Sequence, residues 1–387
     1  MQQAILFKNK NNIFPDLDED QLLEDLFQAY FDARGNKRNT INALRFEMNF
    51  EENIFSLFEE IISGKYDLKP SICFIVSKPV KREIFAADFR DRVVHHLVYN
   101  YISPIFERRF IHDAYSCRRG KGVHYGIKRA EHFIRSCSNN YKDDCYILKL
   151  DVKSYFMSIN KELLFDLIIS EIEKDKRKNG EFNFSFLLVK KLLRIIVFSD
   201  PTKECIIKGK RSDWDGLPKG KSLFLSKKGC GLPIGNLTSQ LFGNIYLNKL
   251  DHFIKEDVGI KYCGRYVDDI LIVHRDKEYL KEVIFQIKKH LITETLLDLH
   301  PKKTYLQHFS KGVVYLGLII KPYRKYLTKR IKNNFYCAVF ESKENKKIKE
   351  TVNSFLGIMS HCNSYNLKEK HKHSFRRAIL ELHGCAL

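Results

Sequence analysis

The hydrophobic pattern predicts both helices and strands. Apolar residues recur at helical spacing in residues 16–64, which predicts two amphipathic helices around a basic loop from Arg34 to Arg38. The same spacing in residues 187–198 and 277–292 predicts further helices. Residues 68–79 and the run from Tyr146 to Asp151 favour strands. Further segments predict strands at 297–304 and 313–320, and residues 328–387 predict a strongly basic helical tail.

One predicted hairpin carries two adjacent acids. The stretch from Lys261 to His274 is typical of two strands with Asp268 and Asp269 at the tip. The four residues after Asp269 are all apolar, which indicates a central strand buried on both faces. Two-residue hairpin turns favour Asn-Gly or Asp-Gly, so Asp-Asp is a poor choice for the turn itself. An exposed acidic turn with solvated charges is one interpretation, and a buried pair that is either protonated or bridged by a cation is the other.

A third acid and a polar helix are further candidates. Asp151 follows a predicted buried strand, where it could bind a metal or simply act as a helix cap or loop acid. The segment from Gly231 to Asp251 opens with a Gly-Pro turn and continues as a helix. Small polar side chains on that helix would allow close approach to a ligand, although a packed helix with polar surface positions explains them equally well.

Basic side chains gather in two places. Arg90 and Arg92 lie on a predicted helix, either as phosphate clamps or as part of a solvated face. The loop from Tyr115 to His124 is basic and broken by glycine, which suits contact with a nucleic-acid backbone. It lacks the Lys-Ser/Thr ending of a Walker A loop.

The overall composition narrows the partners. The formal net charge of +20 favours a polyanion, with nucleic acid ahead of a membrane surface. No run reaches the roughly 18 to 20 apolar residues of a membrane span, and the first residues lack a secretory layout. The ten cysteines are scattered singly, which argues against a zinc ribbon or a disulfide framework. We therefore expect a soluble, cytoplasmic protein.

Asp151, Asp268 and Asp269 would suffice for a metal site if their strands are neighbours. Two divalent ions bound by several carboxylates stabilise in-line phosphoryl transfer. Magnesium prefers oxygen ligands, which agrees with the lack of a clustered His or Cys ligand set.

The order of these blocks resembles the palm of a reverse transcriptase. Tyr266-Val-Asp-Asp269 resembles the catalytic hairpin, and Leu150-Asp151 with Tyr155-Phe156 resembles the first metal motif. Within that family, four segments are similar to reverse transcriptases of diversity-generating retroelements: Gly231 to Gln240, Trp214 to Phe224, Ile84 to His96, and Asn353 to Tyr365. The likeness covers roughly residues 80–370. Most reverse transcriptases carry Gln at the position of Ile234.

The resemblance implies an α+β right-hand polymerase. Its N-terminal helices and fingers, with part of the palm, would span residues 1–145. The palm, an antiparallel sheet with packed helices, would span 146–325 with an insertion at 170–230, and a helical thumb would span 326–387.

The resemblance also implies roles for individual residues. Asp151 and Asp268 would hold two metal ions, supported by Asp269 and by the carbonyl group of Val152, while Lys303 would protonate the leaving group. Phe156 would be the steric gate against a 2′ hydroxyl, and Ile234 would lie beside the sugar of the incoming nucleotide. The expected nucleotide-binding residues are Arg82, Tyr155, Phe156, Ile234, Gly235 and Gln240, and the expected nucleic-acid-binding residues are Arg90, Arg92, Arg118, Arg119 and Lys121.

The implied activity is error-prone synthesis of cDNA, mutagenic at template adenines, from a template-repeat RNA. Its cofactors would be two Mg²⁺ ions, or Mn²⁺, with dNTP substrates. Its partners would be the template RNA, the cDNA primer–template duplex and an accessory protein that forms a pentameric barrel, with no membrane. The alternatives are a group II intron, retron or phage-defence reverse transcriptase, or a non-catalytic RNA-binding relative. Three intact buried acids argue against the last of these.

Overall fold

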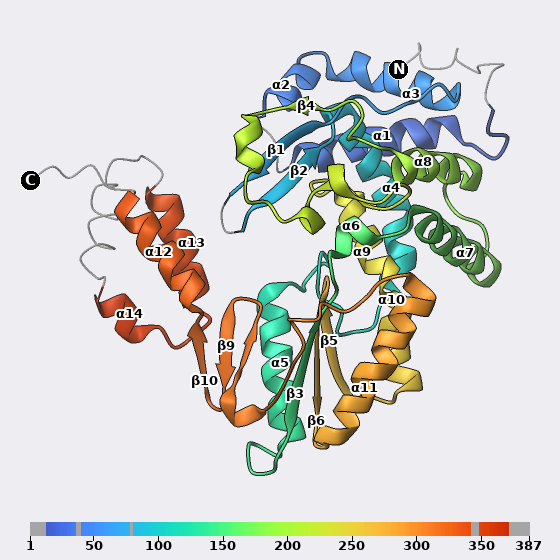
Figure 1. The fold of residues 1–387 in the computed structure, drawn as a ribbon. Helices are drawn as coiled ribbons and strands as arrows, with labels where there is room; N and C mark the ends of the chain where they lie inside the picture. The colour runs from blue at the N-terminus through green and yellow to red at the C-terminus, as the bar shows by residue number, and fades with distance from the viewer. Residues whose placement is uncertain (1–12, 36–39, 78–79, 342–347, 371–387) are drawn as a thin grey trace, which may run out of the picture. The chain divides into compact units, whose positions relative to one another are not determined.

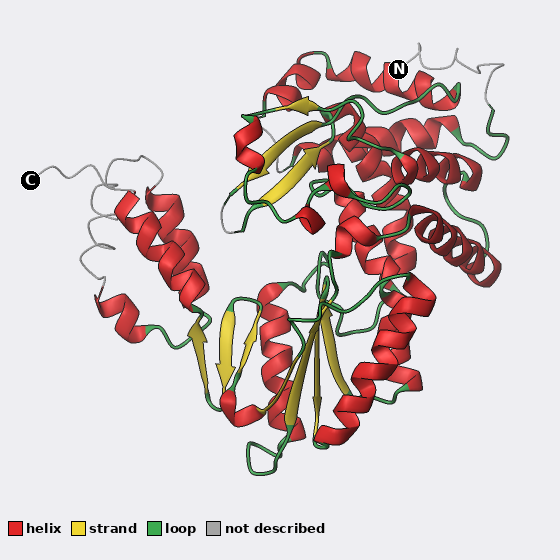
Figure 2. Ribbon diagram, viewed as in Figure 1, coloured by secondary structure: helices red, strands yellow, loops and turns green. Residues whose placement is uncertain are grey.

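The computed structural model describes residues 13–35, 40–77, 80–341 and 348–370 (Figure 1). The chain divides into two compact units, each assembled from separate stretches of sequence. The first unit lies within residues 1–111, 152–253 and 287–300, and the second within 112–151, 254–286 and 301–387. Both units combine helices and strands (Figure 2), which confirms the α+β class.

Helices dominate the first unit. The pattern in residues 16–64 predicted two helices, but the structure has three, because the run is interrupted at Asn49 between α2 and α3. Asp18 caps the first helix, accepting a hydrogen bond from the Gln21 N–H at 3.1 Å. Part of the basic loop predicted at 34–38 lies outside the described residues. The helices are α1 (Glu19–Arg34), α2 (Ile41–Met48), α3 (Phe50–Ile62), α4 (Phe89–Glu107), α6 (Tyr155–Ser158), α7 (Lys161–Asn179), α8 (Phe186–Phe198), α9 (Leu237–Tyr246) and α10 (Asn248–His252).

A small sheet completes the first unit. Strand β1 (Ile72–Val76) pairs antiparallel with β2 (Arg82–Ala86) and parallel with the short β4 (Ile206–Ile207). The insertion after β4 forms three 3₁₀ turns, η1 (Arg211–Trp214), η2 (Lys219–Lys221) and η3 (Leu223–Leu225). The predicted strand 68–79 is thus confirmed in its centre, while Pro79 lies outside the described residues.

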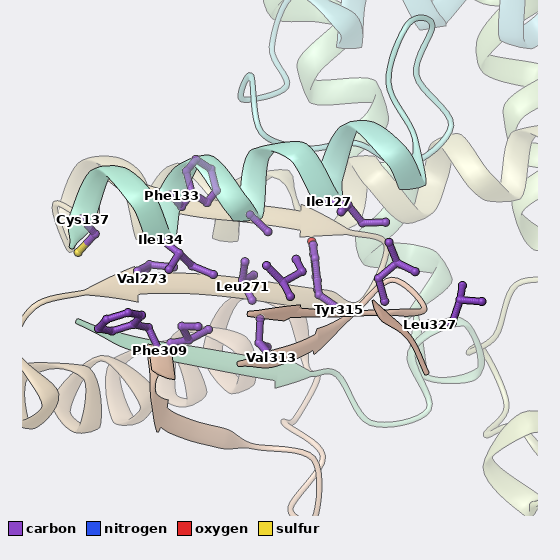
Figure 3. Packing of buried hydrophobic residues seen from close by; sticks show 14 of the residues in the cluster. Ile127, Phe133, Ile134, Cys137, Leu271, Val273, Phe309, Val313, Tyr315 and Leu327 are labelled. Carbon is purple, nitrogen blue, oxygen red and sulfur yellow. The ribbon is translucent and has the colours of Figure 1, made fainter. Parts of the chain in front are cut away.

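A four-stranded antiparallel sheet forms the centre of the second unit. Its order is β5-β6-β3-β7, from β3 (Tyr146–Asp151), β5 (Tyr262–Tyr266), β6 (Asp269–His274) and β7 (Tyr305–His308). The four apolar residues of β6 are each at most 1% exposed, which confirms the prediction of a central strand. Helix α5 (Val123–Cys137) packs on this sheet, and Figure 3 shows its Phe133 and Ile134 near Leu271 and Val273 of β6. Helix α11 (Lys277–His290) follows β6 and ends in a π-helical turn, Leu291–Thr295.

A second, three-stranded sheet follows β7. Its strands β8 (Val313–Tyr315), β9 (Leu318–Lys321) and β10 (Arg324–Leu327) are antiparallel. The single strand predicted at 313–320 is therefore wrong, because Leu316 and Gly317 adopt positive φ values of 47° and 91° and turn the chain. Helices α12 (Lys329–Glu341), α13 (Ile348–Met359) and α14 (Tyr365–Lys370) come next. The rest of the predicted basic tail, 342–347 and 371–387, lies outside the described residues.

The strand predicted at 297–304 is also wrong. Within it, Leu299 forms only an isolated bridge with Val152, and the regular strand begins at Tyr305. Pro301 has no N–H to donate to a ladder, and residues 301–302 form a turn. The fingers, palm and thumb boundaries remain a prediction. In the described part of the chain, no helix has the length and apolarity needed to span a bilayer.

Candidate active site

Three aspartates meet at one end of the larger sheet. Asp151, the last residue of β3, is paired across the strands with Asp269, the first residue of β6. Asp268 directly precedes Asp269 in the turn between β5 and β6. The antiparallel register therefore brings together acids that are more than a hundred positions apart in the sequence. All three belong to the second unit.

The hairpin turn is one residue earlier than predicted. Tyr266 pairs with Asp269, so the two central turn residues are Val267 and Asp268. Val267 has a φ of 57°, a region that a β-branched side chain rarely adopts. The prediction that Asp268 and Asp269 both occupy the tip is thus corrected, because Asp269 already belongs to the strand ladder.

Two lysines contact these carboxylates. The Lys303 Nζ donates to Asp151 Oδ2 at 2.9 Å and to Oδ1 at 3.1 Å. The Lys149 Nζ lies 3.2 Å from Asp269 Oδ1. Lys303 was predicted from the resemblance, whereas Lys149 was not. Its position two residues before Asp151 was the available signal, because residues i and i+2 of a strand share a face.

Burial and mutual repulsion raise the proton affinity of the hairpin acids. Burial, and then the charges of Asp269 and Asp151, raise the pKa of Asp268 to about 6. Burial also raises the pKa of Asp269, partly offset by Lys149, with a further increase from Asp151. Burial alone would lower the pKa of Lys303, but its hydrogen bond to Asp151 and the neighbouring acids raise it. The three carboxylates therefore repel one another at this site, and bound cations would reduce that repulsion.

The donor set fits a hard divalent cation. Carboxylate oxygens are the ligands that magnesium and manganese prefer. Among the described residues, no three His, Cys, Asp or Glu side chains are already arranged as a metal centre. Two of the three carboxylates here face lysines instead. Val152, whose carbonyl group was predicted as a ligand, is buried at 1% exposure and bridges to Leu299.

Two predicted nucleotide-binding residues share an apolar cluster in the first unit. Phe156 and Ile234 both pack against the buried group formed by Cys73, Phe85, Met157 and Leu223. The Ile234 carbonyl accepts a hydrogen bond from the Phe85 N–H at 2.8 Å. Tyr155, by contrast, is buried, and its hydroxyl donates to the carbonyl group of Gly243.

The other predicted nucleotide-binding residues are more exposed. Gly235 has a φ of 133°, and a Cβ there would lie 2.9 Å from the Phe85 carbonyl oxygen, so the position requires glycine. Arg82 is exposed at the start of β2, and Gln240 is exposed on α9. The structure thus brings Ile234 and Gly235 onto β2 at Ile84 and Phe85.

The two helix arginines serve the interior of the first unit. Arg90 is 7% exposed, pairs with Glu60 and donates to Asp91 Oδ1 at 2.8 Å. This geometry favours a structural role for Arg90 over the predicted phosphate contact. The half-buried Arg92 donates from Nε to the Ala87 carbonyl group at 3.0 Å.

The basic loop of the second unit is more accessible. Arg118 donates to the Ala114 carbonyl group at 3.0 Å, and Lys121 donates to the His112 carbonyl group. Arg119 is exposed and Arg118 and Lys121 are half-buried. Of the predicted nucleic-acid contacts, Arg119 has the most accessible side chain.

Comparison with known proteins assigns the chain to a family. The family described as reverse transcriptase (RNA-dependent DNA polymerase) matches residues 78–320, which contain the three aspartates and Lys303. The chain belongs to the reverse transcriptase family. This family is that of RNA-directed DNA polymerases. Enzymes of this family use an RNA template, divalent metal ions and dNTPs.

Individual relatives are distant. Protein YkfC of Escherichia coli K12 is 23% identical over 296 residues, covering 67% of this chain and 69% of that protein. A putative COX1/OXI3 intron 1 protein of Saccharomyces cerevisiae is 22% identical, covering 78% of this chain and 31% of that protein. An uncharacterized 91 kDa protein in a cob intron of Schizosaccharomyces pombe is 23% identical, covering 58% of this chain and 23% of that protein. The chain thus matches less than a third of each fungal protein.

Solved structures also match the chain, at lower sequence identity than these relatives. Two structures of apo telomerase from Candida tropicalis, one of them truncated, align with TM-scores of 0.46. The truncated form is 15% identical, covering 71% of this chain and 60% of that one. The other structure is 13% identical, covering 85% of this chain and 64% of that one. With TM-scores below 0.5, these matches add nothing to the family assignment.

Proposed function

We propose that this reverse transcriptase is the polymerase of a diversity-generating retroelement. In this role it copies a template-repeat RNA into cDNA with frequent errors at template adenines. The meeting of Asp151 with Asp268 and Asp269 at adjoining strand ends carries the polymerase part of the proposal. The resemblance of the segments around Ile234 and Trp214 to this group of enzymes supports the retroelement part.

The proposed chemistry is two-metal nucleotidyl transfer. Asp151 and Asp268 would hold both ions, with Asp269 in support and the Val152 carbonyl group as a further ligand. Two Mg²⁺ ions, or Mn²⁺, would activate the primer 3′ hydroxyl and neutralise the triphosphate. Lys303 donates to Asp151 Oδ2 at 2.9 Å, and in this proposal it would give a proton to the leaving pyrophosphate. Lys149 would keep Asp269 oriented on the same sheet.

Removing the hairpin carboxylates tests this chemistry. We expect Asp268→Asn with Asp269→Asn to abolish primer extension on an RNA template, because the amides remove both negative charges. Asp166→Asn, which changes an exposed acid on α7, is the matched control and should extend normally. Equal extension by wild type and the double variant would refute the polymerase mechanism.

Ile234 carries the proposed low fidelity. An aliphatic side chain offers the incoming nucleotide no hydrogen bond, so the alignment of correct and incorrect nucleotides differs less. We expect Ile234→Gln or Ile234→Asn to reduce misincorporation opposite template adenine by about fivefold, the worth of one neutral hydrogen bond. Ile234→Val keeps the aliphatic character and is the control. Sequencing cDNA from each variant measures the effect, and unchanged adenine errors would contradict the role of Ile234.

The proposed partners follow from the same assignment. They are the template RNA, the cDNA primer–template duplex and an accessory protein that forms a pentameric barrel.

The similarity to two fungal proteins named for introns favours an intron-encoded reverse transcriptase as the second candidate. The neighbouring DNA separates the two: a repeat pair that differs at adenines beside a short reading frame supports the first, and flanking intron sequence supports the second.

A further inference from the structure

A buried arginine lies immediately before the catalytic hairpin. Arg265 of β5 is 1% exposed and is the largest of the fully buried side chains among the described residues. A guanidinium group is costly to bury without hydrogen bonds. Its Nη1 donates to the carbonyl oxygen of Val267 at 2.9 Å. Arg265 therefore reaches past Tyr266 and binds the turn itself.

The bond is made to the peptide group that decides the type of turn. The φ angle is positive at Val267 and not at Asp268, which is the type II′ pattern. A type I′ turn would require a positive φ at Asp268 as well, and the two types differ by rotation of the peptide between these residues. Type II′ favours glycine at its first central position, so valine gives this turn no local support. The stabilisation has to come from elsewhere in the fold.

We propose that Arg265 is a positioning residue that locks the Val267–Asp268 peptide and thereby orients Asp268 for nucleotidyl transfer. The proposal rests on the catalytic role assigned above to Asp268 and Asp269. Rotation of this peptide would change the direction in which the Asp268 carboxylate leaves the turn. Tyr266 and Asp269 would stay paired in the ladder, so the effect is confined to the turn.

Arg265 is itself held by a network within the second unit. Its N–H donates to the Asp113 carbonyl group at 2.8 Å, and its own carbonyl group accepts from the Tyr115 N–H at 3.0 Å. The Asp113 carboxylate accepts from Arg129 Nε at 2.7 Å. A Cβ at Gly264 of β5 would collide with the Tyr115 hydroxyl, so the segment that contains Asp113 and Tyr115 packs directly on β5. The network gives Arg265 a fixed base from which to hold the turn.

Replacing Arg265 in two backgrounds tests the proposal. The full chain is assayed by steady-state primer extension on an RNA template with Arg265→Met, Val267→Gly and the double variant. Arg265→Met should lower kcat about 10- to 100-fold, while KM for dNTP changes less than about twofold. In the Val267→Gly background, Arg265→Met should lower kcat by less than about fivefold, because glycine favours a type II′ turn even without the arginine.

Controls separate positioning from general damage. Arg265→Lys keeps the positive charge but replaces the planar guanidinium group with a compact ammonium group. Its kcat should therefore fall between those of wild type and Arg265→Met. Arg90→Met removes another buried arginine, in the first unit, and Val267→Gly should not rescue it. If Arg265→Met melts too early to assay, the Arg265→Lys pair of backgrounds carries the comparison.

The outcomes are distinct. Restoration by Val267→Gly supports the proposal. An equal loss of kcat in both backgrounds, or no loss at all, overturns it. An active Asp268→Asn, Asp269→Asn enzyme would instead refute the proposed function on which it rests. An inactive one, combined with an unrescued Arg265→Met, refutes only the role of Arg265.

Discussion

At the scale of single residues, Asp268 should make the metal-free protein sensitive to pH. An unfolded aspartate has a pKa of about 3.9, whereas burial and the charges of Asp269 and Asp151 raise the folded pKa of Asp268 to about 6. The folded chain binds more protons between these values, so its stability falls as the pH rises through this range. Above pH ~6 the full penalty remains.

Asp268→Asn should therefore raise the melting temperature of the metal-free protein at pH ~7.5 by on the order of 2 °C or more. At pH ~4 the difference should vanish, because wild-type Asp268 is then largely protonated. Thermal melts in chelator across this pH range measure the effect. Asp166→Asn, at an exposed site, should show no such trend. A stabilisation equal at both pH values would contradict the assigned pKa.

The sequence was sufficient to find the acids and insufficient to find what holds them. Asp151 ends one predicted apolar strand, and Asp268 and Asp269 directly precede another, so their meeting at adjoining strand ends could be predicted. The contact from Arg265 to Val267 could not, because it depends on a positive φ that no local pattern of Tyr-Val-Asp-Asp indicates. Arg90 shows the opposite case, since a charged side chain expected at the surface is used inside the fold.

At the scale of elements, one buried acid anchors the insertion after β4. Glu83 of β2 is 1% exposed and accepts hydrogen bonds from Trp214 Nε1 at 2.7 Å, Ser222 Oγ at 2.8 Å and the Leu223 N–H at 2.5 Å. These donors span the turns η1 to η3. A carboxylate can accept all three, whereas a glutamine would direct its own NH₂ group at some of them.

We expect Glu83→Gln to loosen the insertion, with a cost of about 1 to 3 kcal/mol for the unpaired donors. Limited trypsin digestion measures this, because Lys219 and Lys221 are exposed on η2 and should be cut faster in the variant. Glu204→Gln changes an exposed acid near β4 and should leave the cleavage rate unchanged. Equal digestion of Glu83→Gln and wild type would show that the anchor lies elsewhere.

Elements with strong periodicity were predicted well, and those fixed by turns were not. The apolar run of β6 and the helix at 186–198 stand close to their predicted bounds. The region around Pro301 was assigned to a strand because apolar residues flank it, although its backbone cannot complete a ladder. The hairpin at Leu316 and Gly317 was hidden inside an uninterrupted apolar run. Local composition therefore identifies buried segments better than it locates their turns.

At the scale of the whole molecule, charge is distributed unevenly. The chain carries a net charge of +20, yet residues 16–62 contain twelve Asp and Glu against four Lys and Arg. Helices α1 to α3 are therefore poorly suited to a phosphate backbone. The basic loop with Arg119 belongs to the other compact unit. The net charge of the whole chain would assign the acidic helices and the basic loop the same polyanionic partner. The charge of each region by itself assigns that partner to the basic loop alone.

Salt dependence should separate these regions. Each protein–phosphate contact contributes about 0.9 to the slope of log affinity against log salt on duplex DNA. We expect Arg119→Gln to reduce the slope for an RNA–DNA primer–template by about 1 and to weaken binding regardless of its sequence. Arg45→Gln removes another exposed arginine, from α2, and should leave the slope unchanged, because α2 lies within the acidic stretch 16–62. Fluorescence anisotropy between about 50 and 200 mM salt measures both slopes. If the two variants lose the same slope, binding depends on total charge rather than on the position of the basic loop.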